Sequence, residues 1–287
     1  CGGGDDEPQR TIVEIAQNNP DLSILVEAVV AAGLTQTLST GSLTVLAPTN
    51  AAFAALLTEL GVTKEALLAN KTLLTAVLSY HVLGSKVARA DVPVGKAITP
   101  LAGGFFKIEA TGGLKVTDGR NRVSNITATD IQASNGVVHL LDRVLLPADK
   151  DIVATASVLP DFSILVEAVA AAGLVSTLQG QGPFTVFAPT NAAFAALLAE
   201  LGVTKEALFA NKALLTSVLT YHVVPARVLK AEVPVGSPIT SVQGQTFTVS
   251  ASLAISDQRM RTSDIVAADV FTSNGVIHVV DKVILPR

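Results

Sequence analysis

The chain has 287 residues and is poor in charge: Asp, Glu, Lys and Arg make up 15% of it, hydrophobic residues 49%, and the net charge is −4. About 25% charged residues is usual. No run of lysines and arginines provides the basic surface that nucleic acid needs, so composition excludes nucleic acid as a partner. Glu27, Glu59 and Glu167 interrupt the longest apolar stretches, which therefore fall short of the about 18 residues of a membrane-spanning helix.

The single cysteine is residue 1, and three glycines and the acidic residues Asp5, Asp6 and Glu7 follow it. A single thiol cannot form an internal disulfide. Residues 1–9 are therefore predicted to be a flexible tether with nothing to pack. This start resembles the mature end of a bacterial lipoprotein, and the glycine-then-acidic pattern is similar to the export signal of Bacteroidetes surface lipoproteins. The resemblance implies that Cys1 is lipidated and anchors the chain to the bacterial outer membrane, facing the cell exterior.

After the tether, the chain contains two copies of one sequence, 139 to 141 residues apart. The repeated segments are residues 21–29, 47–53 and 134–139, which return as residues 161–169, 188–194 and 273–278. A nearly constant offset of this size means that each copy is a complete domain, since the units of a solenoid have roughly 20 to 50 residues. The predicted domains are residues 10–147 and 148–287.

Each copy is predicted to begin with helices. Asp21 is placed to cap a helix whose apolar residues recur at helical spacing as far as the stop signal Gly33, and residues 162–173 repeat the pattern. Short β-rich runs follow at residues 43–47 and 184–188.

An alanine-rich helix comes next in each copy, after Thr49-Asn50 and Thr190-Asn191, which are predicted caps. Thr63 and Thr204 are predicted to cap a further helical stretch that ends near Tyr80 and Tyr221.

The later part of each copy changes to short β-rich runs separated by turns. Asn135-Gly136 and Asn274-Gly275 are hairpin signals. The runs that follow them place His139 and His278 among apolar residues, as expected of buried strands. Helices first and strands later indicate an α+β fold in both copies.

Three motifs, in the same order in both copies, together resemble the fasciclin domain family. They are Thr-Val-Leu/Phe-Ala-Pro-Thr-Asn-Ala-Ala-Phe at 44–53 and 185–194, Tyr-His at 80–81 and 221–222, and Asn-Gly-Val-Val/Ile-His at 135–139 and 274–278. The resemblance implies two tandem fasciclin-like domains, each a wedge of short β-strands flanked by helices. It also implies a protein of cell surfaces or extracellular matrix that works by adhesion. In animal members the Tyr-His neighbourhood has been implicated in integrin binding, so Tyr80, His81, Tyr221 and His222 are the candidate binding residues.

All four histidines lie in these motifs, which raises the alternative of catalysis. Asp142 and Asp281 follow His139 and His278 by three residues, but residues three apart on a strand point to opposite faces. No cysteine or carboxylate stands at metal-ligand spacing from a histidine. We therefore predict no catalytic residue, metal or cofactor.

The histidines and the tyrosines have a structural interpretation instead. Tyr80 and His81 would hydrogen-bond buried backbone at a helix end, and His139 would be a satisfied polar group of the core. For Asn50, Asn191, Asn135 and Asn274 the structural interpretation, as caps and turns, is also favoured.

Trp is absent and both tyrosines belong to the Tyr-His pairs, so the flat aromatic platforms of sugar-binding modules are missing and a polysaccharide ligand is disfavoured. Low charge favours protein contact. The predicted function is a non-enzymatic module of adhesion or protein interaction on the cell surface. One alternative is an accessory lipoprotein subunit docked on an outer-membrane protein complex; the other is a hydrolase that uses His81 or His222.

Overall fold

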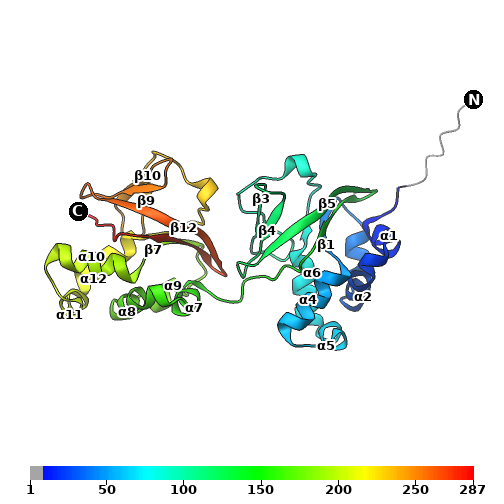
Figure 1. The fold of residues 1–287 in the computed structure, drawn as a ribbon, viewed down its shortest axis with the longest axis horizontal. Coiled ribbons are helices and arrows are strands. Elements are labelled where there is room, and N and C mark those ends of the chain that lie inside the picture. Colours follow the sequence, from blue (N-terminus) through cyan, green and yellow to red (C-terminus); the bar gives the residue numbers. More distant parts are fainter. Residues whose placement is uncertain (1–8) are drawn as a thin grey trace, which may run out of the picture. The chain divides into compact units, whose positions relative to one another are not determined.

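The computed structural model describes residues 9–287, which form two compact units; the chain passes from the first to the second between Pro147 and Ala148 (Figure 1). Cys1 and all but the last residue of the predicted tether lie outside the described residues. The two units repeat the same order of helices and strands, with one additional short strand in the second.

In the first unit, helices precede most of the strands. Its elements are α1 (Ile12–Gln17), η1 (Pro20–Leu22), α2 (Ser23–Ala31), α3 (Thr35–Ser39), β1 (Leu43–Pro48), α4 (Asn50–Leu60), α5 (Lys64–Ala69), α6 (Lys71–Tyr80), β2 (Val82–Leu83), η2 (Arg89–Asp91), β3 (Lys107–Glu109), β4 (Lys115–Thr117), β5 (Val123–Ala133) and β6 (Gly136–Leu141). The strands form one sheet in the order β2-β1-β6-β5-β4-β3, in which β1 and β6 are parallel and the other neighbours antiparallel.

The second unit has the corresponding sheet in the order β8-β7-β13-β12-β11-β10-β9, with β7 and β13 parallel. Its elements are α7 (Ile152–Ser157), η3 (Pro160–Phe162), α8 (Ser163–Ala171), α9 (Val175–Leu178), β7 (Phe184–Pro189), α10 (Asn191–Leu201), α11 (Lys205–Ala210), α12 (Lys212–Tyr221), β8 (Val223–Val224), η4 (Lys230–Glu232), β9 (Ile239–Thr240), β10 (Thr246–Val249), β11 (Ala254–Ser256), β12 (Thr262–Thr272) and β13 (Gly275–Val280).

Strands at the centre of each sheet are buried on both faces. Every residue of β1 is buried, with Val45 in the core that the helices form and Leu46 in a second core with Tyr80 and Phe106. Figure 1 shows the labelled α-helices of each unit gathered on one side of its sheet. Burial on both faces explains why these strands are continuous apolar runs rather than alternating ones, and the predicted α+β class is confirmed.

Asn50 caps a helix that is distant in the sequence. Thr49 caps α4 itself, because its hydroxyl accepts a hydrogen bond from the N–H of Ala52 (3.3 Å). The Asn50 side chain instead reaches α2, where Oδ1 accepts from the N–H of Ile24 (2.9 Å) and the amide donates to the carbonyl of Pro20 (3.0 Å). The prediction that Asn50 caps its own helix is therefore wrong.

The second unit repeats this connection, since Asn191 accepts from the N–H of Ile164 (2.9 Å) while Thr190 caps α10. The first turn of α2 has no capping side chain from its own segment, so the prediction that Asp21 caps it is wrong too. Both errors have one cause. The orphan N–H groups of a helix can be satisfied by a side chain from any neighbouring element, and sequence spacing shows only local candidates.

Both predicted hairpins form, but their turns lie one residue earlier than the Asn-Gly pairs, at residues 134–135 and 273–274, and Gly136 and Gly275 begin β6 and β13. The Asn of each pair also connects two helices. Asn135 Oδ1 accepts from the N–H of Ile12 (2.9 Å) at the start of α1, and its amide donates to the carbonyl of Leu38 (2.9 Å) near the end of α3. Gly136 lies opposite Leu43 in the parallel pair, where a Cβ would approach the Leu43 carbonyl oxygen to 1.8 Å. Glycine is required there by the close approach of the two backbones.

In the second unit, Asn274 accepts from the N–H of Ile152 (3.0 Å) and donates to the carbonyl of Leu178 (2.7 Å). A Cβ on Gly275 would lie 1.9 Å from the carbonyl oxygen of Phe184. The Asn-Gly pair therefore makes the same hydrogen bonds and the same close backbone contact in both copies.

The helical stretch predicted to run from Thr63 to Tyr80 is two helices. Thr63 caps α5 as predicted, by accepting from the N–H of Ala66 (3.1 Å). Asn70 then ends α5 and caps α6, because its side chain accepts from the N–H of Leu73 (3.2 Å). The chain changes direction at Asn70, and α6 then ends at Tyr80, next to the sheet strand β2.

Replacing Asn191 by Ala is expected to destabilise the second unit more than replacing Asn211, which only caps its own helix α12 through the N–H of Leu214. Loss of a local cap costs about 1 kcal/mol. Asn191→Ala also removes hydrogen bonds to Pro160 and α8, so the free energy of unfolding should fall by about 2 kcal/mol or more. Urea denaturation measures both, and equal losses in the two variants would contradict the role of Asn191 as a link between helices.

Candidate functional site

The Tyr-His pairs lie at the ends of α6 and α12 and are buried. Tyr80, His81, Tyr221 and His222 are 1%, 2%, 0% and 1% exposed. The Tyr80 hydroxyl donates to the carbonyl of Phe105 (2.6 Å), and Tyr221 donates to the carbonyl of Thr246 (2.6 Å). Burial raises the pKa of both hydroxyls, so each remains a neutral donor. None of these four side chains is placed to contact a partner in this conformation.

His81 connects the end of α6 to the C-terminal segment of its unit. Its Nδ1 lies 2.7 Å from the carbonyl oxygen of Val77, and its Nε2 accepts from the N–H of Leu145 (2.8 Å). A carbonyl can only accept and an N–H can only donate, so the ring is neutral with the proton on Nδ1. His222 makes the corresponding bonds to Val218 (2.7 Å) and Ile284 (3.0 Å).

The surroundings of both rings favour the neutral form. Burial lowers the pKa of His81 and of His222 to about 4, and the charges of Arg122 and Arg261 act in the same direction, whereas the hydrogen bonds to the backbone carbonyls oppose the shift. Because both nitrogens of each ring are occupied by backbone groups, neither ring is free to act as a general base on a substrate. The geometry therefore does not provide the site that the hydrolase alternative requires.

His139 connects β6 to an irregularity in β5 and to the loop after β2. Its Nδ1 accepts from the N–H of Asp130 (3.1 Å), which has a positive φ of 59°, and its Nε2 donates to the carbonyl of Val87 (2.8 Å). Asp142 is occupied elsewhere, since its carboxylate accepts from the N–H of Asn125 (2.7 Å). His139 is thus a hydrogen-bonded polar group of the interior and forms no dyad with Asp142.

His278 has the equivalent place in the second unit, with the N–H of Asp269 on Nδ1 (3.2 Å) and the carbonyl of Val228 beside Nε2 (2.7 Å). In both units the ring therefore carries its proton on Nε2, the opposite tautomer to that of the Tyr-His histidines.

A charged cluster that the motifs did not reveal holds the same C-terminal segment. The Arg122 guanidinium donates to Asp118 (2.8 Å) and to Glu59 (2.9 Å), and the fully buried Asp118 carboxylate also accepts from the N–H of Leu146 (2.9 Å). The hydrogen bond from Arg122 lowers the pKa of the Glu59 carboxyl, although burial opposes the shift. The recurrence of the Asp and Arg spacing at Asp257 and Arg261 was the available sequence signal.

Within residues 9–287, no three His, Cys, Asp or Glu side chains gather closely enough to hold a metal ion. Over the same residues, no helix combines the length and the apolar character needed to cross a bilayer. Every buried side-chain nitrogen and oxygen of this part of the chain has a hydrogen-bond partner. The buried polar side chains of the described residues thus have a structural role as hydrogen-bond partners within the fold.

The surface nearest to the Tyr-His pairs is a loop in each unit, which we call the corner loop: residues 99–104 in the first unit and 240–245 in the second. Leu101 is 49% exposed, and its N–H donates to the carbonyl of Val82 (2.8 Å), which directly follows the Tyr-His pair. Val242 is 43% exposed and makes the same bond to Val223 (2.7 Å). Neither loop contains a charged residue. The residue that follows each Tyr-His pair therefore holds the corner loop in place, and this loop forms an uncharged, partly apolar surface.

Comparison with known proteins assigns the family. The fasciclin domain model matches residues 20–147 and 160–286, so the chain belongs to the fasciclin domain family and carries two fasciclin domains in tandem. The tandem arrangement and the fold class expected from the motifs are thereby confirmed.

Several relatives share this domain. Protein sll1483 of Synechocystis is 48% identical over 128 residues, which cover 44% of this chain and 67% of that protein. Transforming growth factor-beta-induced protein ig-h3 of Sus scrofa is 28% identical over 86% of this chain but only 35% of its own length. A solved FAS1 domain pair from the insect cell adhesion molecule fasciclin I matches with a TM-score of 0.47 and 17% identity, over 92% of this chain and 97% of that one.

The buried histidines predict acid sensitivity well above the range in which carboxylates titrate. A histidine titrates near pH 6.5 in the unfolded chain, whereas burial lowers the pKa of His81 and His222 to about 4 in the folded one, so the unfolded state takes up protons first as pH falls. The stability contributed by the neutral rings is complete above about pH 6.5 and is lost toward pH 4.

Between pH 7 and 5 the loss should be about 2 kcal/mol in each unit, measured as the free energy of unfolding in urea. His222→Asn should be less stable at pH 7 and should show a flatter dependence in the second unit. A wild-type stability that does not change between pH 7 and 5 would contradict this account.

Proposed function

We propose that this protein is a non-enzymatic module of adhesion or matrix interaction that binds other proteins at a cell surface. Membership of the fasciclin family supports the general class, since fasciclin domains occur in adhesion proteins. The observation that carries the proposal is the construction of the corner loops. Each exposes an aliphatic side chain and no charge, above a Tyr-His pair whose side chains are buried and fully hydrogen-bonded.

The corner loop suits protein contact for two reasons. Charged residues are depleted from the core of protein interfaces, and Leu101 and Val242 lie in segments without charge. Their backbones are also held by hydrogen bonds to β2 and β8, which reduces the entropy lost when a partner binds. The partner would thus contact the loops, while Tyr80, His81, Tyr221 and His222 position them.

The anchor is the second part of the proposal. Cys1, followed by glycines and acidic residues, supports lipidation at the N-terminus and a position on the outer membrane of a bacterium, facing the cell exterior. Several acyl chains on one cysteine would make a stable anchor, whereas a single chain binds only weakly. Surface or matrix proteins would then be the partners, and polysaccharide remains disfavoured because the chain has no Trp.

An accessory subunit of an outer-membrane protein complex is the alternative. The same neutral surface that supports adhesion would also suit a permanent contact with a membrane protein, since such interfaces are more apolar than transient ones. The two functions differ in the number and the location of partners, and this difference can be measured.

Crosslinking of the native protein on intact cells, followed by mass spectrometry of the captured proteins, tests the proposal. Leu101→Lys and Val242→Lys together should reduce capture at least tenfold, because a buried charge at an interface is costly. Val62→Lys and Val203→Lys are the matched control, since both valines are 40% exposed and lie outside the corner loops. Equal capture by the two double variants would contradict a role for these loops.

The identity of the captured proteins separates the alternatives. Several surface or extracellular proteins are expected of an adhesin, whereas one dominant outer-membrane protein in fixed ratio would assign an accessory subunit. The intact mass of the same native preparation should show acyl chains on Cys1, and an unmodified cysteine would overturn the proposed anchor.

A further inference from the structure

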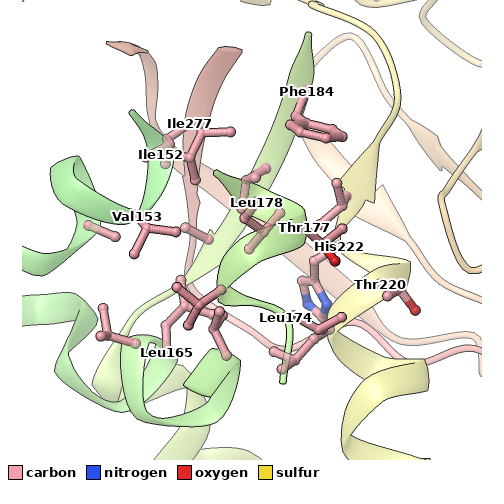
Figure 2. Close-up of a pocket in the computed structure, with 18 of the residues that line it drawn as sticks. Ile152, Val153, Leu165, Leu174, Thr177, Leu178, Phe184, Thr220, His222 and Ile277 are labelled. Carbon is pink, nitrogen blue, oxygen red and sulfur yellow. The ribbon is translucent and has the colours of Figure 1, made fainter. Parts of the chain in front are cut away.

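The second unit contains an apolar pocket that is much larger than its counterpart in the first. The pocket has a volume of about 90 Å³, whereas the corresponding position between α1, α2 and β1 has about 30 Å³. Figure 2 shows side chains converging on it from several elements, among them Ile152 of α7, Leu165 of α8 and Ile277 of β13. It opens to solvent where its lining includes the exposed residues Ala170, Thr177 and Val242.

The walls of this pocket offer no hydrogen bonds. None of the surface that faces it is polar. His222 forms part of the wall (Figure 2), but its nitrogens are bonded to Val218 and Ile284, and the hydroxyl of Thr220 donates to Thr216 (2.7 Å). A bound water needs two to four polar partners, and apolar cavities without them stay dry. The pocket therefore favours an apolar occupant over water.

We propose that this pocket binds the end of an unbranched aliphatic chain of a lipid-like molecule. A cavity of about 150 Å³ can hold benzene, so 90 Å³ accommodates a few methylene groups while the rest of the molecule leaves through the opening. Each buried methylene contributes about 0.8 kcal/mol. The opening shares Val242 with the corner loop of the second unit, but binding of the aliphatic chain requires no protein partner and is measured without one.

An aliphatic chain fits this site better than a segment of a partner protein does. A peptide would bring its own N–H and C=O groups to the opening, where they need hydrogen-bond partners. The opening presents mostly aliphatic groups, and the Thr220 hydroxyl already has a backbone partner. An aliphatic chain requires no such partner.

Three of the residues that line the pocket differ between the two copies in a way that favours the second. Ala170 and Val242 of the second unit correspond to the larger Val30 and Leu101 of the first, and Val175 corresponds to the polar Thr35. The second unit thus has smaller or more apolar side chains at all three positions. This difference assigns the site to the second unit alone.

Methyl NMR of the full chain with n-decanol as the probe tests the proposal. The methyl signals of Ile152 and Ile277 should shift with saturation as decanol is added, while that of Ile12 at the matching position of the first unit should not. Thr177→Trp places an indole at the opening and should weaken decanol binding at least tenfold. Thr37→Trp, at the equivalent exposed position of the first unit, should leave it unchanged.

Ala170→Val introduces the residue that the first unit has at this position and should also weaken decanol binding. This variant replaces Thr177→Trp as the test if Thr177→Trp does not fold. Equal shifts in both units, or unchanged affinity in folded Thr177→Trp, would overturn the proposal. Tighter binding of N-acetyl-leucine amide than of decanol would also overturn it and assign the pocket to a side chain of a partner protein. Loss of protein capture in the crosslinking experiment leaves this result unaffected, so the two proposals fail separately.

Discussion

In each unit, one buried imidazole has to remain neutral in a single tautomer. His81 donates to the carbonyl of Val77 and accepts from the N–H of Leu145, so it joins the last turn of α6 to the segment that closes the unit. Without this ring, both buried backbone groups would lose a hydrogen-bond partner, which costs about 1–3 kcal/mol for each group. Tyr80 bonds to Phe105 from the same helix end, and the corner loop lies between these attachments. The position of the exposed loop therefore depends on the buried pair.

The two copies retain this framework and differ at the surface. His139 and His278, the long-range caps Asn50 and Asn191, and the Arg-carboxylate clusters recur with the same partners. The volume of the apolar pocket does not recur, since it is about 90 Å³ in the second unit and about 30 Å³ in the first. Duplication thus preserved what the fold requires, and the differences between copies indicate where separate ligands would bind. Residues that are identical in the two copies therefore identify the structural framework, and they say less about the surface that contacts a partner.

Much of the fold was predictable because local signals were strong. Thr63 and Thr49 act as the caps that their sequence context indicates, and a hairpin forms at the predicted position, with its turn at residues 134–135. The partners of Asn50 and of Asn135 were not predictable, because those hydrogen bonds join segments 26 and 123 residues apart. The parallel pairing of β1 with β6 was not predictable either, since nothing in the intervening sequence indicates which strands pair.

For the site, the sequence offered Tyr80, His81, Tyr221 and His222 as candidates, and all four side chains are buried, whereas Leu101 and Val242 in the corner loops are exposed. The central claim concerns those histidines, and nitrogen-15 NMR of the imidazole rings tests it directly. At pH 7 the account predicts neutral rings with the proton on Nδ1 in His81 and His222. Averaged signals from both tautomers, or titration of His81 and His222 near pH 6.5, would show accessible rings and contradict the account.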